Sequence, residues 1–352
     1  MNSMAKVNSR NTDLIINYIK EYPKCSSNDI LINAGIETSI ATLKRHLQRL
    51  VSENIIIATG QLKGTKYEIS PVYEIIESID INEYFENEID ERKIKHGFNP
   101  DLMNIQLKNM EIFTKDEMLH LSALQAQYLH NVSTLSEMEF KKELERLAID
   151  LSWKSSQIEG NTYSLLETER LLKDKETAAG KTKEEASMLL NHKEALDFII
   201  ANPDYLYPLN VSGIEDIHSL LIKELGINRN IRNNRVGISG TNYRPLDNEF
   251  QIREALNDTC TLINIKENIF EKALLCLMLI SYIQPFGDGN KRTARIVSNA
   301  ILIHNHYCPV SFRTVDSIEY KKAMLIFYEQ NNISAFKKMF IDQFEFAVKT
   351  YF

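Results

Sequence analysis

The sequence predicts a mainly α-helical protein preceded by a small α+β domain, and three observations lead to this. Apolar residues recur at spacings of three and four over much of the 352-residue chain. A run of β-branched residues within 55–69 instead favours strands. Further along, the stretch Ile283–Arg295 is a polar loop pinned between two helical patterns, because Pro285 and Gly287 end the first pattern and 288–290 can begin the second.

Residues 1–70 are expected to form the first domain, because three helical patterns there are followed by a two-stranded ribbon. The helices are predicted at 11–21, 26–35 and 38–50, and the ribbon within 55–69. The third helix is predicted to point four apolar side chains inward: Ile40, Leu43, Leu47 and Leu50.

Three helices and a ribbon resemble a winged helix-turn-helix domain, whose third helix enters the major groove while the wing touches the DNA backbone. The side chains expected to contact DNA are Thr42, Arg45, His46, Arg49, Lys63 and Lys66. Residues 1–70 hold nine basic and six acidic residues, a balance of +3 in a chain of net charge −7, so the remainder carries −10. Because +3 is a weak footprint for nucleic acid, a module for protein contact is the alternative.

Residues 71–110 are predicted to be an acidic connector, since residues 71–100 hold eight acidic and three basic residues. Helical patterns then continue over 111–352, which is expected to be the second domain. The first of these patterns places four leucines in the core: Leu119, Leu121, Leu124 and Leu129.

Composition excludes several classes of protein. Apolar residues make up 43% and charged residues 25%, as in ordinary globular proteins. No apolar segment approaches ~18 uninterrupted residues, so no contact with a membrane is expected. The four scattered cysteines suggest neither a disulfide framework nor a zinc site. With a polar N-terminus that lacks a signal region, these features predict a cytoplasmic protein.

The loop and the helix after it have the chemistry of an anion site. A helix N-terminus presents backbone N–H groups without partners and a positive dipole end, which together bind phosphates. Gly289 lets the backbone approach closely, while Lys291 adds charge. Asp288 fits such a site if it holds a divalent cation that bridges phosphate oxygens. The plainer interpretation is an aspartate cap followed by solvated basic residues.

The order of residues in this stretch resembles the signature of the Fic/Doc (Fido) family, His-Pro-Phe-x-Asp/Glu-Gly-Asn-Gly/Lys-Arg-x-x-Arg. The matching residues are Pro285, Phe286, Asp288, Gly289, Asn290, Lys291, Arg292 and Arg295. The resemblance implies a helical core that transfers AMP, or another phosphate-bearing group, from a nucleotide to a protein hydroxyl. It implies ATP and Mg²⁺ as cofactors, with the metal on Asp288. The implied nucleotide ligands are Gly287, Gly289, Asn290, Lys291, Arg292 and Arg295.

One position of the signature departs from the family. The histidine that serves as general base falls on Gln284, and glutamine cannot accept a proton from an attacking hydroxyl at neutral pH. No histidine in the neighbouring sequence is an obvious substitute, because His304 and His306 lie about three turns further along. The resemblance thus supports nucleotide binding more firmly than catalysis, and transfer is predicted to be weak or absent.

A second motif lies ahead of the signature, in a helix predicted near 150–161. The run from Ser155 through Glu159 to Gly160 resembles the family's inhibitory motif, Ser/Thr-x-x-x-Glu-Gly/Asn. The resemblance implies that Glu159 pairs with Arg295 and occupies the place of the γ-phosphate of ATP. The plainer interpretation is a helix end closed by glycine, with the glutamate in solvent.

Residues 232–245 change character, with short β-like segments around two glycines. By resemblance this is the flap, a β-hairpin that clamps the target protein by main-chain pairing. The flap residues expected to meet the target are Gly240, Thr241, Asn242 and Tyr243.

Together these features predict a Fic-like nucleotide-binding protein: a protein adenylyltransferase, or a weakened form of one, inhibited by Glu159. The expected partners are a nucleotide, a protein with a Ser, Thr or Tyr hydroxyl, and duplex DNA through the first domain, with a homodimer left open. The alternative is a DNA-binding transcriptional regulator whose second domain senses nucleotide without transfer. A third hypothesis, transfer of phosphate as in Doc-like members of the family, is supported only by Lys291.

Overall fold

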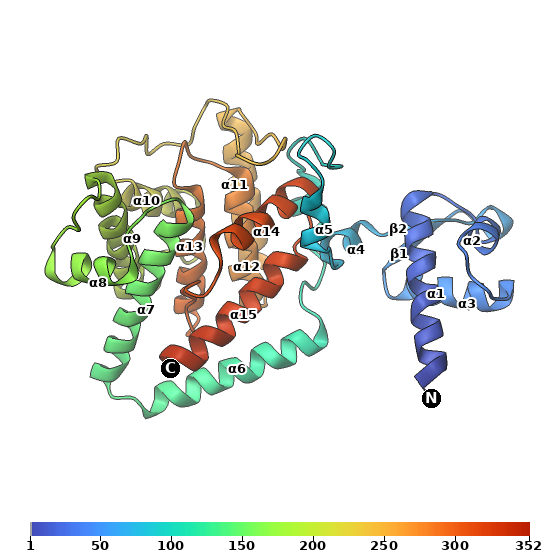
Figure 1. Cartoon of the computed structure of the whole chain (residues 1–352), viewed down its shortest axis with the longest axis horizontal. Coiled ribbons are helices and arrows are strands. Elements are labelled where there is room, and N and C mark those ends of the chain that lie inside the picture. Colours follow the sequence, from blue (N-terminus) through green and yellow to red (C-terminus); the bar gives the residue numbers. More distant parts are fainter. Residues whose placement is uncertain (1) are drawn as a thin grey trace. The chain divides into compact units, whose positions relative to one another are not determined.

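In a computed structural model, the chain is described for the backbone of residues 2–352 and for the side chains of 11–62 and 64–352. It divides into two compact units, Met1–Glu77 and Ser78–Phe352. The course of the chain through the units can be followed in Figure 1.

The first unit has the expected order of three helices and a two-stranded ribbon. Ser26 closes a capping box on the second helix and Ser39 caps the third, so polar side chains set both helix starts. The strands pair antiparallel, with Ile56 opposite Ile69. The elements are α1 (Asn2–Glu21), α2 (Ser27–Asn33), α3 (Ile40–Ser52), β1 (Ile56–Thr59), η1 (Leu62–Gly64), β2 (Lys66–Ile69) and α4 (Pro71–Ile76).

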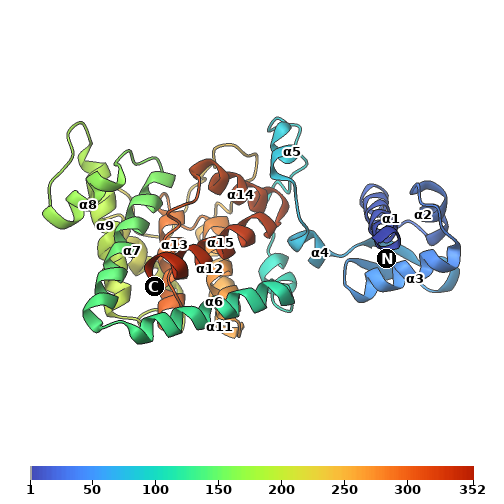
Figure 2. The same cartoon turned by 60° about the horizontal axis from the view of Figure 1, so that its bottom comes forward.

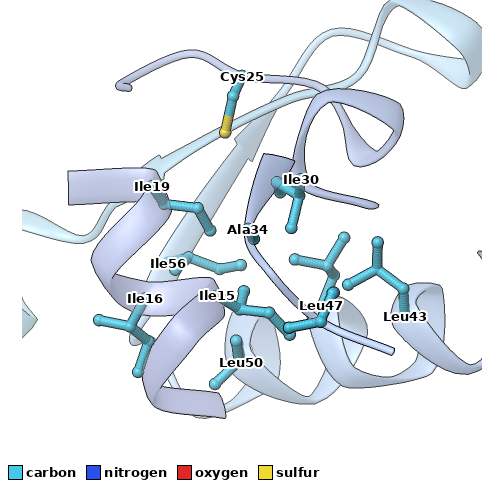
Figure 3. Close-up of a cluster of buried hydrophobic side chains, with 11 residues drawn as sticks. Ile15, Ile16, Ile19, Cys25, Ile30, Ala34, Leu43, Leu47, Leu50 and Ile56 are labelled. Carbon is cyan, nitrogen blue, oxygen red and sulfur yellow. The ribbon is translucent and has the colours of Figure 1, made fainter. Parts of the chain in front are cut away.

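This unit has an apolar core of its own, drawn in Figure 3. Leu43, Leu47 and Leu50 of α3 are fully buried against Ile15 and other side chains of α1, α2 and β1. The prediction for Ile40 was wrong, because this side chain is 37% exposed. Ile40 is the first residue of α3 and lies outside the apolar cluster that the three leucines join.

The second unit is helical throughout its regular structure. Its elements are α5 (Ile81–Glu86), η2 (Leu102–Gln106), α6 (Lys115–Thr134), α7 (Glu137–Ile158), α8 (Leu165–Asp174), α9 (Lys183–Ala201), α10 (Val211–Leu221), α11 (Glu249–Ile265), α12 (Ile269–Ile283), α13 (Asn290–His304), α14 (Ser317–Gln330) and α15 (Ser334–Tyr351).

Two helices, α12 and α13, form the centre of this unit. They pack extensively on each other, and α12 is buried all round from Ala273 to Ile283. The helices α7, α9 and α10 cover one side of α13, while α14 contacts α12. Figure 2 shows the long α6 running alongside α15. The loop between α12 and α13 is therefore held at both ends by the most buried helices of the unit. Among the described residues, none of the helices combines the length and apolar character needed to span a bilayer.

Two expectations about this part of the chain differ from the structure. Residues 78–110 belong to the second unit, because buried polar contacts attach them to it, so they are not a free connector. Leu119 and Leu129 are 70% and 49% exposed, whereas Leu121 and Leu124 are buried. The apolar stripe of α6 is therefore narrower than predicted, since only one turn-spaced row faces α15.

The predicted β-hairpin at 232–245 is also wrong, because the described backbone there forms turns and bends without strands. Two of its backbone N–H groups pair with other segments instead of with each other. The Arg232 N–H donates to the Pro285 carbonyl at 3.0 Å, and the Arg244 N–H donates to the His96 carbonyl at 2.9 Å. A segment whose backbone partners lie elsewhere cannot close a ladder of its own.

Candidate functional site

The loop between α12 and α13 is shaped by two residues in the left-handed region and by one asparagine. Gln284 ends α12 at φ 51°, and Gly289 precedes α13 at φ 81°. The side chain of Asn290 accepts from the Phe286 N–H at 2.8 Å and donates to the Phe286 carbonyl at 2.9 Å. Asn290, expected as a nucleotide ligand, thus also holds the loop in its fold.

His218 of α10 packs against this loop, and no sequence pattern pointed to it. Its ring stacks on Phe286 with centroids 3.6 Å apart, and its Nε2 lies 3.0 Å from the carbonyl of Asp288. A histidine therefore lies close to the signature in space, although it is 70 positions from Asp288 in the sequence. Burial lowers the pKa of His218, which favours the neutral ring. Its place under the loop makes it a supporting residue.

The first turn of α13 presents unpartnered N–H groups and a set of cations. Thr293 is the first residue of the helix whose N–H reaches back, to Gly289. Arg292 is almost fully buried, and its guanidinium donates to the Asp288 carboxylate at 3.1 Å. The Asp288 side chain itself is 64% exposed. The turn can therefore hold an anion, with one carboxylate at its edge.

Arg295 joins this turn to α7, as the sequence predicted. Its Nε donates to Ser155 Oγ at 2.8 Å, and its Nη2 donates to the Ser155 carbonyl at 3.0 Å and to Glu159 Oε1 at 2.9 Å. Arg295 is fully buried, while the Glu159 side chain is 19% exposed. Gly160 follows at φ 101°, a conformation that favours glycine.

Glu159 lies between two cations, since Lys291 Nζ is 3.5 Å from its Oε2. Burial alone would raise the pKa of this carboxyl, but the charges of Arg295 and Lys291 outweigh burial, so the pKa of Glu159 lies below its ordinary value. The carboxylate is therefore ionised at neutral pH. It becomes protonated, and its contribution to stability is lost, only as the pH falls through that lowered pKa.

Gln284 is tethered on both sides of its amide. Its Nε2 donates to the Ser281 carbonyl at 2.6 Å and lies 3.4 Å from the Tyr328 hydroxyl, while its Oε1 accepts from Asn290 at 3.0 Å. Because the amide carries no basic lone pair, nothing at this position takes up a proton.

Part of this set lines a cavity of about 370 Å³, whereas Gly289, Arg292 and Arg295 are not among its lining residues. One wall is Ile158 and Glu159, and another is Val236–Ser239. The floor includes Gln284, Gly287, Asp288, Asn290 and Lys291. Lys321, Met324, Leu325 and Tyr328 of α14 complete the lining. A volume of this size lies within the usual range for small-molecule sites. The cavity unites three stretches that the sequence singled out separately.

The flap residues that line this cavity differ from those predicted to meet the target protein. Val236–Ser239 line it, whereas Gly240, Thr241 and Asn242 lie further along, and Tyr243 is buried. Tyr243 stacks on Tyr282 and donates to its carbonyl at 3.2 Å. Apolar ring surface and a satisfied hydroxyl explain why it packs inward instead of facing a target.

Arg232 is a second residue that sequence reasoning missed. Its guanidinium, which is buried, donates to the carbonyls of Gln284 at 2.6 Å and of Asn234 at 2.6 Å. It thereby ties the start of the flap to the loop that carries the signature. Its only signal in the sequence is its position at the first residue of the segment.

The donor set fits Mg²⁺ bound together with phosphate oxygens. Among the described residues, no group of three or more His, Cys, Asp or Glu side chains could hold a metal alone. Mg²⁺ is commonly held by one or two carboxylates plus substrate phosphates, and Asp288 supplies one exposed carboxylate beside the helix N-terminus. When bound there, the ion would neutralise charge on the phosphates.

The residues expected to contact DNA are only partly placed as predicted. Arg45 and Arg49 of α3 are exposed, and Lys66 is half-exposed with its Nζ 3.9 Å from Asp29. Thr42 and His46 are partly buried, because they lie next to the apolar row of the helix. The side chain of Lys63 lies outside the described residues.

In the second unit, a polar loop, a helix N-terminus and an opposing carboxylate meet at one cavity within a helical core. Residues 208–302 match the family model of the Fic/DOC family. Residues 208–302 of this chain are therefore similar to a Fic/DOC domain.

Known proteins resemble the chain well beyond this match. A protein adenylyltransferase Fic of Nematostella vectensis is 30% identical over 192 residues, which are 52% of this chain and 44% of that protein. The protein adenylyltransferase fic-1 of Caenorhabditis elegans is 26% identical over 170 residues, which are 46% and 33% of the two chains. The chain spans less than half the length of these curated relatives.

Solved structures share the fold of the second unit. Fic-1 from C. elegans superposes with a TM-score of 0.59 at 19% identity, covering 67% of this chain and 72% of that one. A Fic-domain-containing signalling protein from Bacteroides thetaiotaomicron gives a TM-score of 0.57 at 19% identity, covering 66% and 95%. These likenesses show the mainly helical Fic fold.

Proposed function

We propose that this protein is a protein adenylyltransferase held inactive by Glu159 and weakened by Gln284. The observation that carries the proposal is that the α13 N-terminus, Glu159 and the flap line the same cavity. The curated relatives, named as protein adenylyltransferases, support the same chemistry. ATP is the proposed substrate, and a Ser, Thr or Tyr hydroxyl of another protein is the acceptor.

The residues divide the work by position. The N–H groups of the first turn of α13, with Lys291, hold the phosphates, and Asp288 holds Mg²⁺. The acceptor oxygen bonds to the α-phosphorus, the bond from that phosphorus to the bridging oxygen breaks, and pyrophosphate leaves. The hydroxyl proton passes to water, since Gln284 cannot accept it. While Glu159 holds Arg295, this cation is not available to the γ-phosphate.

Replacing Glu159 by glycine is expected to tighten binding of Mg-ATP by about tenfold or more. A carboxylate ~4 Å from a phosphate repels it by up to about 4 kcal/mol at an effective dielectric of 20, and the change removes this repulsion. Isothermal titration calorimetry measures the affinity. Gln157→Gly is the matched control, because it loosens the same helical turn and keeps the carboxylate. Absence of Mg-ATP binding to both the wild type and Glu159→Gly would refute the proposal.

A second candidate function, DNA binding, is favoured by the outer face of α3. Four exposed polar side chains lie along it: Lys44, Arg45, Gln48 and Arg49. Two of these are engaged locally, since Arg45 donates to Thr42 at 3.3 Å and Arg49 donates to Thr12 at 3.2 Å. Such bonds between exposed groups are readily exchanged for phosphate contacts.

If the first unit binds duplex DNA, the affinity is expected to fall steeply with salt. Replacing Arg45 and Arg49 by glutamine should reduce the slope of log affinity against log salt by about 2, one for each lost phosphate contact. Fluorescence anisotropy with a pool of random duplexes measures it. The control Lys20→Gln, Lys24→Gln removes the same charge away from α3. If both double variants show equal slopes of log affinity against log salt, or if no duplex binds at low salt, the unit serves for protein contact.

A further inference from the structure

The flap is attached at two points, each held by a buried guanidinium. Arg232 ties its start to the loop, as described above. Further along the flap, Nη2 of Arg92 donates to the carbonyl of Gly240 at 2.8 Å. The residues between these two points include Val236–Ser239, which line the cavity. The cavity-lining part of the flap is therefore fixed on both sides.

Arg92 is itself held in place by α14 and α5. Its side chain is 3% exposed, and its Nη1 donates to Glu329 Oε2 at 3.2 Å and lies 3.2 Å from Oε1. Glu329 is fully buried and also accepts from the Tyr84 hydroxyl at 2.6 Å. The guanidinium lies 5.1 Å from the ring centroid of Phe85. A planar fork with several donors can serve Glu329 and Gly240 together, which a lysine cannot do from the same position.

Further contacts run between the same two segments. The Asn242 side chain donates to Asp90 at 2.8 Å, and the Arg244 N–H donates to the His96 carbonyl. Together with the bond from Arg92, these bonds engage every second residue of the flap from Gly240 to Arg244. The acidic stretch that the sequence left without a role is thus the support on which the flap rests.

We propose that Arg92 is a positioning residue, which holds the flap beside the cavity so that the flap can present an acceptor segment to the bound nucleotide. The role in presenting an acceptor rests on the transferase function proposed above. The attachment itself is independent of that function. Arg92 does not line the cavity. It acts through its bond to Gly240 and contacts no reacting atom.

Arg92→Lys separates positioning from folding. The lysine keeps its charge opposite Glu329 and loses the second donor to Gly240, so the melting temperature should stay close to that of the wild type. Backbone amides in 233–244 should exchange with deuterium about tenfold faster or more, as expected when one hydrogen bond from a charged group is lost. Arg244→Lys is the matched control, because this exposed arginine is held through its backbone.

Two readouts test the proposal in the full chain. In the Glu159→Gly background, Arg92→Lys should leave the affinity for Mg-ATP within twofold and lower several-fold the transfer of labelled AMP to lysate proteins. Unchanged exchange over 233–244 would overturn the proposal, and so would faster exchange spread evenly over the second unit. If exchange rises over the flap while Glu159→Gly transfers nothing, the attachment stands and the transferase function fails.

Discussion

The variant that combines Gln284→His with Glu159→Gly is expected to transfer AMP about 10²–10⁴-fold faster than Glu159→Gly alone, the usual contribution of a general base. At present the amide of residue 284 is occupied by the Ser281 carbonyl and by Asn290, and it has no site for a proton. An imidazole there would be neutral near pH 7 and could take the proton of the attacking hydroxyl. Transfer of label from ATP to lysate proteins, counted after gel separation, measures the difference.

The matched control for this change is Gln284→Asn in the same Glu159→Gly background, since asparagine also lacks a basic nitrogen. Its rate should not exceed that of Gln284. Equal and substantial labelling by the histidine and glutamine forms would mean that a different group takes the proton. If neither form labels any protein while Mg-ATP still binds, the protein senses nucleotide without transferring it.

Arg295→Met is expected to lower the free energy of unfolding by about 3 kcal/mol, in the range for removal of one partner from a buried ion pair. The change leaves the hydroxyl and carbonyl of Ser155 without their donor, in a place with no access to water. It also leaves Glu159 with Lys291 alone. Urea denaturation followed by circular dichroism measures the loss.

A surface arginine provides the comparison. Arg253→Met breaks ion pairs with Glu215 at 3.5 Å and Glu249 at 3.8 Å, but these are exposed and should cost no more than about 1 kcal/mol. In a double-mutant cycle, Glu159→Gln should reduce the cost of Arg295→Met, because the two residues share the contact. A cost for Arg295→Met equal to that for Arg253→Met would show that the pair does not stabilise the fold.

Local patterns predicted the helices of the first unit because their starts are fixed within a few residues. Ser26 and Ser39 cap their helices through bonds to N–H groups three residues on. The prediction of a β-hairpin for the flap was wrong for the opposite reason, because the backbone N–H groups of Arg232 and Arg244 pair with residues far away in the sequence. Propensity within 232–245 carries no information about such partners.

The candidate site was predictable only where a motif reported it. Glu159 and Arg295 are 136 positions apart, and their pairing came from two motifs read together, which the structure places 2.9 Å apart. No motif contains His218, Arg232 or Arg92, and each is a single polar residue in its segment. Nothing in their neighbourhoods distinguishes them from solvated side chains until the fold brings them to the loop and the flap.

The Glu159 carboxylate, proposed above to be inhibitory, lies on the residue that follows Ile158, the last helical position of α7. A residue beyond the end of a helix moves more readily than the helix itself. Glu159 can therefore leave Arg295 while all 22 residues of α7 stay folded. Ser155 lies one turn earlier and keeps its two bonds to Arg295 when this happens. The guanidinium then loses its counter-charge and keeps its orientation, so activation needs no rearrangement of the helical core.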